Sequence, residues 1–425
     1  MQDNIKKIEK KVDKFIFWFC IVDIMFLPYA WFLTFSWSLP ITILWLLFSF
    51  KFDKRNTDHL AFFLLVITMV ISTVIGNIFF PSFSQNNIIH LIKFIQSFTY
   101  FLIFKTYLNK YHCNLKPFLI SMAIFIISMA VLFVMSVETY QSIRLFWNQR
   151  GIESIMLRPG GDGNRYGFIW MDVNNVSFVI GSLVFFLLTV EKVSAITKFI
   201  IVGGMSVVVT LSMSRAGTYG ILLTAGAYLL LALLTKRFPK LRVSKKTFLL
   251  LSLFAFVILV LITGVDNFIN IDTFRLSIGR FQEETLLDNS RIDIFIEMIG
   301  EANFFYYIAT GFGGEAIVGD RSVAPHNGHL YWILSYGFIS YLSFLYLVFR
   351  KRKVTPLKQY LWILPLFVGF TANIMIGEVK ISGIMFLLIA ASSSELYLSS
   401  RILTIRYKRE INATDEDIIF DEQAL

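Results

Sequence analysis

The chain has 425 residues, of which 56% are hydrophobic and only 16% are charged, and its formal net charge is +10. Soluble globular domains carry about 25% charged residues, so this composition excludes an ordinary soluble domain and indicates an integral membrane protein. The basic residues lie in short stretches between apolar runs. That distribution is typical of membrane topology signals and argues against a nucleic-acid partner.

Apolar runs near the length of about 20 residues that a spanning helix needs follow one another along the chain. Residues 15–50 form the longest run, and Pro28 and Pro40 divide it into a predicted hairpin of two helices. With the two helices of this hairpin, ten other runs predict an all-α membrane protein of about twelve transmembrane helices, in one integral membrane domain over residues 1–425. The ten other runs fall near residues 60–80, 88–108, 118–137, 172–190, 196–213, 216–235, 247–265, 329–349, 358–377 and 381–399.

The Lys and Arg residues are divided unequally between the two sets of connections that these spans create. One set holds 28 of the 39 Lys and Arg residues, of which 20 are Lys. The positive-inside rule places this set in the cytoplasm, together with both termini and the acidic tail 410–425. The other set holds nine Arg and one Lys. Arginine binds phosphate or carboxylate with two parallel hydrogen bonds, so this bias indicates either an anionic ligand on the outer face or pairing of the arginines with outer acidic residues.

Two predicted outer connections, residues 138–171 and 266–328, are long enough to carry a site. The first contains Arg165 and is followed by Asn174 and Asn175, which either belong to a polar site or only cap the next helix. Between the following spans, the turn "SMSRAGTYG" places Arg215 at the membrane surface. A charged residue at the edge of the membrane indicates a functional site, unless its side chain only extends to the lipid headgroups.

The second long connection carries three signals in order. "LDNSRIDIFIEMIGEA" predicts a helix with Arg291 in its first turn, where the positive helix end suits a bound phosphate. "GFGGEA" predicts a Gly-rich turn that includes Glu315 and lacks the GK[ST] of a nucleotide-binding loop. "APHNGHLYW" closes the connection with His326 and Asn327, and His329 in the next span is expected to be a packing residue.

In their order, these segments resemble the O-antigen ligase/polymerase superfamily of bacterial membrane glycosyltransferases, which includes O-antigen and capsular polysaccharide polymerases. The resemblance covers about residues 160–345. It is carried by "SRAG" with Arg215, by "SRIDIF" with Arg291 leading to "GFGG", and by "HNGHLYWILSYGFIS" with His326 and Gly337. "RYGFIWMDVNN" resembles a weaker upstream signature.

The resemblance implies a GT-C-like glycosyltransferase that takes its glycan from an undecaprenyl-diphosphate-linked oligosaccharide at the outer face of the cytoplasmic (inner) membrane. Its other implied partners are membrane lipids, a chain-length regulator and a flippase. The outer connections hold no DxD motif and no His/Cys cluster with ligand spacing, so neither a metal nor another cofactor is expected. Inversion at the anomeric carbon is expected, because no carboxylate pair suits a covalent intermediate. The implied site consists of a general base, His326; diphosphate ligands, Arg215, Arg291 and Arg165; and supporting residues, Asn327, Glu315, Asn174 and Asn175.

Three functions remain open at this point. A polymerase joins lipid-linked repeat units, whereas a ligase moves the finished glycan to lipid A core or another acceptor. Both use the same chemistry, and polymerases are favoured because they form the larger and more divergent group. A flippase or other transporter would place charges along a path through the membrane and often shows inverted repeats. Asp23 and Lys93 are nearly the only charged residues inside the predicted spans, and no repeat is evident, so transport is the weakest of the three.

Overall fold

The computed structural model describes much of the helical part of the chain and several short connections. The described residues are 2–30, 35–79, 84–111, 115–147, 165–169, 173–189, 194–212, 214, 217–218, 220–226, 311, 317–318, 321–322, 327–350, 352, 356–372 and 378–393.

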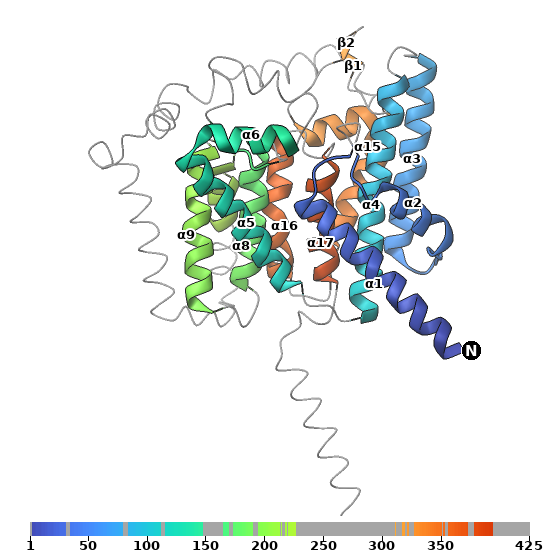
Figure 1. Cartoon of the computed structure of the whole chain (residues 1–425). Helices are drawn as coiled ribbons and strands as arrows, with labels where there is room; N and C mark the ends of the chain where they lie inside the picture. The colour runs from blue at the N-terminus through green and yellow to red at the C-terminus, as the bar shows by residue number, and fades with distance from the viewer. Residues whose placement is uncertain are drawn as a thin grey trace, which may run out of the picture.

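These residues are almost all helical (Figure 1). The helices are α1 (Gln2–Phe26), α2 (Leu39–Phe48), α3 (Thr57–Phe79), α4 (Ser84–Tyr111), α5 (Lys116–Met135), α6 (Val137–Trp147), α8 (Asn175–Thr189), α9 (Ala195–Ser212), α15 (Gly328–Phe349), α16 (Pro356–Ala372) and α17 (Val379–Ser392). Two short strands, β1 (Ile317–Val318) and β2 (Arg321–Ser322), pair antiparallel in the second long connection, where the sequence predicted a helix and a Gly-rich turn but no strand.

Four helices are long and apolar enough to cross a membrane: α3, α4, α5 and α15. The shorter helices α2, α8, α9, α16 and α17 are also apolar. These helices support the expected class, an all-α protein embedded in a membrane. Of the other expected spans, the one near 247–265 and most of the one near 216–235 lie outside the described residues.

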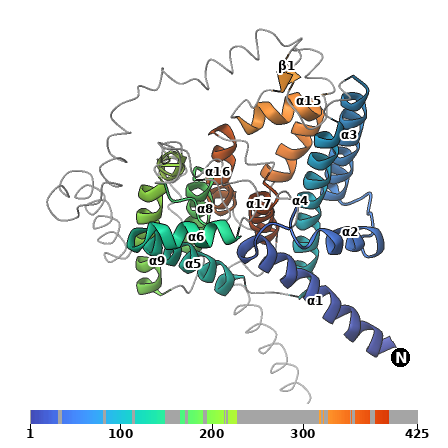
Figure 2. The ribbon, with the colours of Figure 1, turned by 45° about the horizontal axis from the view of Figure 1, so that its top comes forward.

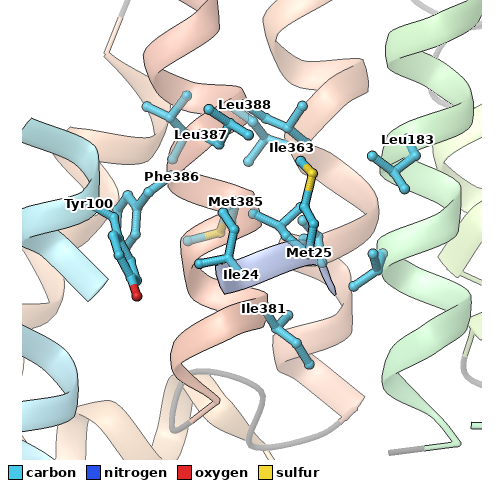
Figure 3. Close-up of a cluster of buried hydrophobic side chains, with 14 of the residues drawn as sticks. Ile24, Met25, Tyr100, Leu183, Ile363, Ile381, Met385, Phe386, Leu387 and Leu388 are labelled. Carbon is cyan, nitrogen blue, oxygen red and sulfur yellow. The ribbon is translucent and has the colours of Figure 1, made fainter. Parts of the chain in front are cut away.

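Helix α17 lies at the centre of the bundle, and every residue from Val379 to Ser392 is buried. A helix that is apolar on all sides needs cover on all sides, and neighbouring helices supply it. It packs most extensively against α4 and also touches α1, α16 and α8. Figure 3 shows Met385 and Phe386 of this helix among side chains of α1, α4, α8 and α16.

The remaining helices are arranged on two sides of α16 and α17 (Figure 1). Helices α5, α8 and α9 form one group, and α8 packs along α16. Helices α3 and α4 lie on the other side, where α3 packs along α15.

The predicted hairpin at residues 15–50 is formed by α1 and α2, and both prolines act as expected. Helix α1 ends two residues before Pro28, and Pro40 lies in the first turn of α2. The apolar half of α1, from Phe15 to Phe26, is about 18 Å long and α2 about 15 Å, at 1.5 Å per residue. Each is therefore much shorter than the hydrocarbon core, which is about 30 Å thick.

A buried ion pair lies at the C-terminal end of α1. Lys380 Nζ lies 3.4 Å from Asp23 Oδ1, and both side chains are fully buried. The same ammonium group donates to the carbonyl oxygens of Asp23 (2.7 Å), Leu27 (2.5 Å) and Pro28 (3.1 Å). The last carbonyls of a helix have no partner within the helix, so Lys380 supplies donors to them inside the protein, where water is scarce.

A second charged cluster lies at the Lys-rich end of the bundle. The Asp58 carboxylate, at the start of α3, accepts hydrogen bonds from Lys105 at 2.5 Å, Arg352 at 2.7 Å and Arg350 at 2.9 Å. Lys105 belongs to α4, and the two arginines follow α15. Segments that the charge distribution places on one side of the membrane therefore do lie together.

Candidate functional site

The first part of the site is a buried arginine held at the ends of α8 and α9. Arg165 is only 7% exposed. Its Nε donates to the carbonyl of Ser212, the last residue of α9, at 3.0 Å, and its Nη2 donates to Asn174 Oδ1 at 2.9 Å. The next residue, Tyr166, donates its N–H to the Leu211 carbonyl at 2.9 Å. Arg165 thus satisfies carbonyls that the end of α9 leaves without helical partners.

Small residues allow the chain that follows α9 to approach α8 closely. The hydroxyls of Ser212 and Ser177 lie 2.6 Å apart. A Cβ atom at Gly217 would lie 2.3 Å from the Ser177 Cβ, so a side chain at Gly217 would force α8 and this turn apart. Gly217 N–H also donates to Ser214 Oγ at 3.1 Å. The positions on both sides of Arg215 are therefore fixed next to Arg165, while Arg215 itself lies outside the described residues.

Helix α6 lies across this end of the α5–α8–α9 group (Figure 1) and holds the Arg165 segment from the other side. Tyr140 of α6 accepts a hydrogen bond from Gly167 N–H at 3.2 Å and donates to the Phe168 carbonyl at 3.3 Å. The rings of Tyr140 and Tyr166 lie 5.5 Å apart. Arg144, one turn after Tyr140, interacts electrostatically with both tyrosines and is 5% exposed. This end of the bundle therefore buries two arginines, Arg144 and Arg165.

The second part of the site is the start of α15. Asn327 caps the helix, because its Oδ1 accepts from the N–H groups of His329 and Leu330, each at 3.0 Å. The His329 ring lies 3.2 Å from the Phe367 carbonyl of α16 through Nε2 and 3.1 Å from the Tyr341 hydroxyl through Nδ1. The prediction that His329 is a packing residue is thus supported by contacts on both ring nitrogens.

Helix α15 is broken at Gly337, which has φ 79° and ψ 167°. Figure 2 shows its two halves running in different directions. Gly311, the first glycine of "GFGG", fits against this break with φ +68°, and a Cβ there would lie 2.4 Å from the Tyr336 nitrogen. Ser72 of α3 donates to the Tyr336 carbonyl at 3.3 Å. Two segments of the family resemblance, the Gly-rich turn and the span after "HNGH", are therefore in direct backbone contact.

Helix α16 connects the two parts of the site. Its Phe367 holds His329, and the adjacent Val368 lies 3.2 Å from where a Cβ would stand on Gly220. Gly220 follows Gly217 by less than one helical turn. The start of α15 and the turn after α9 therefore flank the same stretch of α16.

The predicted site residues are only partly within the described residues. Arg165 and Asn174 are in contact, Asn175 is the buried first residue of α8, and Asn327 is a helix cap. The general base and the other predicted ligands and supporting residue lie outside: His326, Arg215, Arg291 and Glu315.

Sequence reasoning did not select Arg144, because it assigned residues 138–171 to a loop. The apolar side chains at Val137, Tyr140 and Ile143 recur three residues apart and could have revealed α6. The Glu378 carboxylate accepts from the Tyr29 hydroxyl at 2.6 Å, and Lys380 pairs with Asp23.

Comparisons of the chain with models of protein families, with curated protein sequences and with solved structures find no match. The resemblance to the O-antigen ligase/polymerase superfamily therefore remains a prediction from the motifs.

Proposed function

We propose that this protein is a membrane glycosyltransferase that polymerises polyprenyl-diphosphate-linked oligosaccharide repeat units at the outer face of the cytoplasmic membrane. In this proposal the chain has about twelve membrane helices, with both termini in the cytoplasm. The observation that carries it is the buried guanidinium of Arg165, which donates a hydrogen bond to Ser212. Ser212 is the last residue of α9 and precedes Arg215 by three positions.

Each predicted residue then has a role in one displacement. The acceptor hydroxyl oxygen attacks the anomeric carbon of the donor, and its proton passes to His326. The bond between that carbon and the diphosphate oxygen breaks, and the polyprenyl diphosphate departs. Fixed guanidinium groups stabilise its developing negative charge, and losing one such contact costs about 2–4 kcal/mol. These groups are Arg215, Arg291 and Arg165.

The packing around Arg165 supports this role. Electrostatic stabilisation is strong when the charged group is held in place before the reaction, so that no reorganisation is needed during it. The Ser212 carbonyl and the Asn174 side chain hold two edges of the guanidinium, and α6 covers its segment through Tyr140. Arg144, buried on the same side, adds a second positive charge to this end of the bundle.

Reconstitution with defined substrates tests the proposal. The purified protein in liposomes, given only lipid-linked repeat units, should form a ladder of longer lipid-linked glycans. Replacing Arg165 by glutamine should slow the ladder by roughly two to three decades. Replacing Arg55, an exposed arginine at the other end of the bundle, by glutamine should leave the rate unchanged.

Other outcomes separate the competing functions. Transfer that appears only after lipid A core is added indicates a ligase. Translocation of the lipid-linked unit across the liposome without new glycosidic bonds indicates a transporter. A product that retains the anomeric configuration of the donor contradicts the inverting mechanism.

A further inference from the structure

Helix α1 carries an open apolar groove at its Lys-rich end. The groove has a volume of about 430 Å³, and its lining is formed by Lys11, Lys14, Phe15, Trp18, Phe19 and Val22. Phe15 is 60% exposed and Val12, one turn earlier, is 49% exposed. The lining side chains recur at three- and four-residue spacing along one side of α1, where Phe15 is exposed and Trp18, Phe19 and Val22 are half-buried.

Aromatic contacts fix the walls of this groove. Trp18 stacks on Phe118 of α5, with ring centroids 4.1 Å apart and planes inclined by 24°. Phe15 stacks on Phe19 at 5.8 Å. The groove is therefore formed by ordered rings, and a ligand in it would not need to reorganise them.

Two lysines mark one end of the groove. Lys11 and Lys14 are exposed and three residues apart, so their side chains leave the same face of α1. The carboxylate between them is already used, since Asp13 accepts from Lys110 Nζ at 2.8 Å and from the Tyr111 hydroxyl at 2.7 Å. Within the described part of the chain, neither Lys11 nor Lys14 forms an ion pair with a carboxylate.

We propose that this groove binds an anionic glycerophospholipid. The single phosphate would lie between Lys11 and Lys14, and an acyl chain would follow Phe15, Phe19 and Val22. The two lysines suit the anionic headgroup of such a lipid, and the apolar aromatic surface next to them suits its acyl chain. The groove lies where α1 changes from charged to apolar, beside the Lys110 end of α4, and the proposed topology places this change at the level of the phospholipid headgroups. This proposal does not depend on the glycosyltransferase function.

Competitive lipid retention tests the proposal on the full chain. The protein would be purified in micelles that contain equal amounts of phosphatidylglycerol and phosphatidylcholine with identical acyl chains, and retained lipids would be counted by native mass spectrometry. We expect preferential retention of phosphatidylglycerol by the wild type. The double variant K11Q/K14Q should bind it about twenty-five-fold more weakly, from about a factor of five for each lysine.

Matched variants separate the headgroup contact from general charge effects. K11R/K14R should keep the preference, because it keeps both cations. K51Q/K54Q removes two exposed lysines from the connection between α2 and α3 and should also keep it. Phe15→Ser should weaken retention of both lipids equally, because it alters only the apolar wall.

Three results would overturn the proposal. The first is an unchanged preference in K11Q/K14Q. The second is an equal loss in K51Q/K54Q, which would mean that net charge alone attracts the lipid. The third is displacement of phosphatidylglycerol by glycerol phosphate at equal concentration, which would show that the groove takes a free phosphate and that its apolar wall is irrelevant.

Discussion

Replacing Lys380 by methionine should strongly destabilise the bundle. The change keeps the length and apolar stem of the side chain but removes the ammonium group that pairs with Asp23 at 3.4 Å, with both side chains fully buried. Removing one partner of a buried ion pair costs about 3–5 kcal/mol, because the other charge stays buried without compensation. The carbonyls of Asp23, Leu27 and Pro28 lose their donor at the same time. We therefore expect a loss of about 4 kcal/mol, a large fraction of the 5–15 kcal/mol typical of a folded domain.

Unfolding in mixed micelles, followed by tryptophan fluorescence as the denaturing detergent fraction rises, would measure this loss. The matched control is Lys110→Met, which removes an ion pair that is shorter, at 2.8 Å, but half exposed on the lysine side. Exposed pairs contribute about 0–1 kcal/mol, so the control should change the unfolding free energy little. Asp23→Asn should cost much less in the Lys380→Met background than in the wild type, because it removes the uncompensated charge.

Two results would refute this reasoning. Equal losses for Lys380→Met and Lys110→Met would mean that burial does not decide the strength of the pair. Additive effects of the Asp23 and Lys380 changes would mean that the two groups do not interact, because contacting residues normally couple by about 0.5–3 kcal/mol.

Four further predictions follow from the same contacts. Asp58→Asn leaves the cations around it without a counter-charge and should lower the unfolding free energy by about 3 kcal/mol in the same assay. A decrease below about 1 kcal/mol would mean that the cluster behaves as an exposed ion pair. Gly311→Ala should destabilise the protein because of its positive φ and its contact with the α15 backbone, whereas Gly226→Ala, with open space around it, should not. Arg165→Lys should lower the transfer rate at saturating donor, because an ammonium group lacks the planar set of donors with which the guanidinium binds several acceptors at once. An unchanged rate would exclude the proposed role of Arg165. The wild-type rate should fall as the pH is lowered, because the proposed base His326 must be neutral to accept a proton, and a rate that stays the same from pH 8 to pH 5 would exclude this role.

The elements that the sequence predicted well are those that depend on local pattern. The spans near residues 60–80, 88–108, 118–137 and 329–349 correspond to α3, α4, α5 and α15 within a few residues. A long apolar run must form a helix in lipid, since every backbone group needs a partner within the segment. The breaks at Pro28 and Pro40 were predicted for a similar local reason, because proline lacks an N–H donor.

The features that the sequence did not reveal depend on contacts between distant residues. Lys380 and Asp23 are separated by 357 positions, and no pattern in either segment indicates the other. The α15 break was missed because Gly337 lies within an apolar run that otherwise suits a straight span. Glycine is common in membrane helices, so Gly337 alone does not predict a break. The break becomes evident only in the structure, where Gly311 lies against the backbone of α15 next to it.

The break at Gly337 determines the direction in which α15 meets the candidate site. Beyond it, the second half of α15 ends beside Arg350 and Arg352, which pair with the Asp58 carboxylate. The first half begins at the Asn327 cap, directly after His326, and His329 contacts α16. The non-helical dihedral angles at Gly337 change the direction of the helix, so that the first half lies against α16 through His329 while the second half runs to Arg350 and Arg352. Contacts across the break fix the angle between the two halves, because the Tyr341 hydroxyl lies 3.1 Å from His329 Nδ1 and Trp332 Nε1 donates to Ser340 Oγ at 2.9 Å.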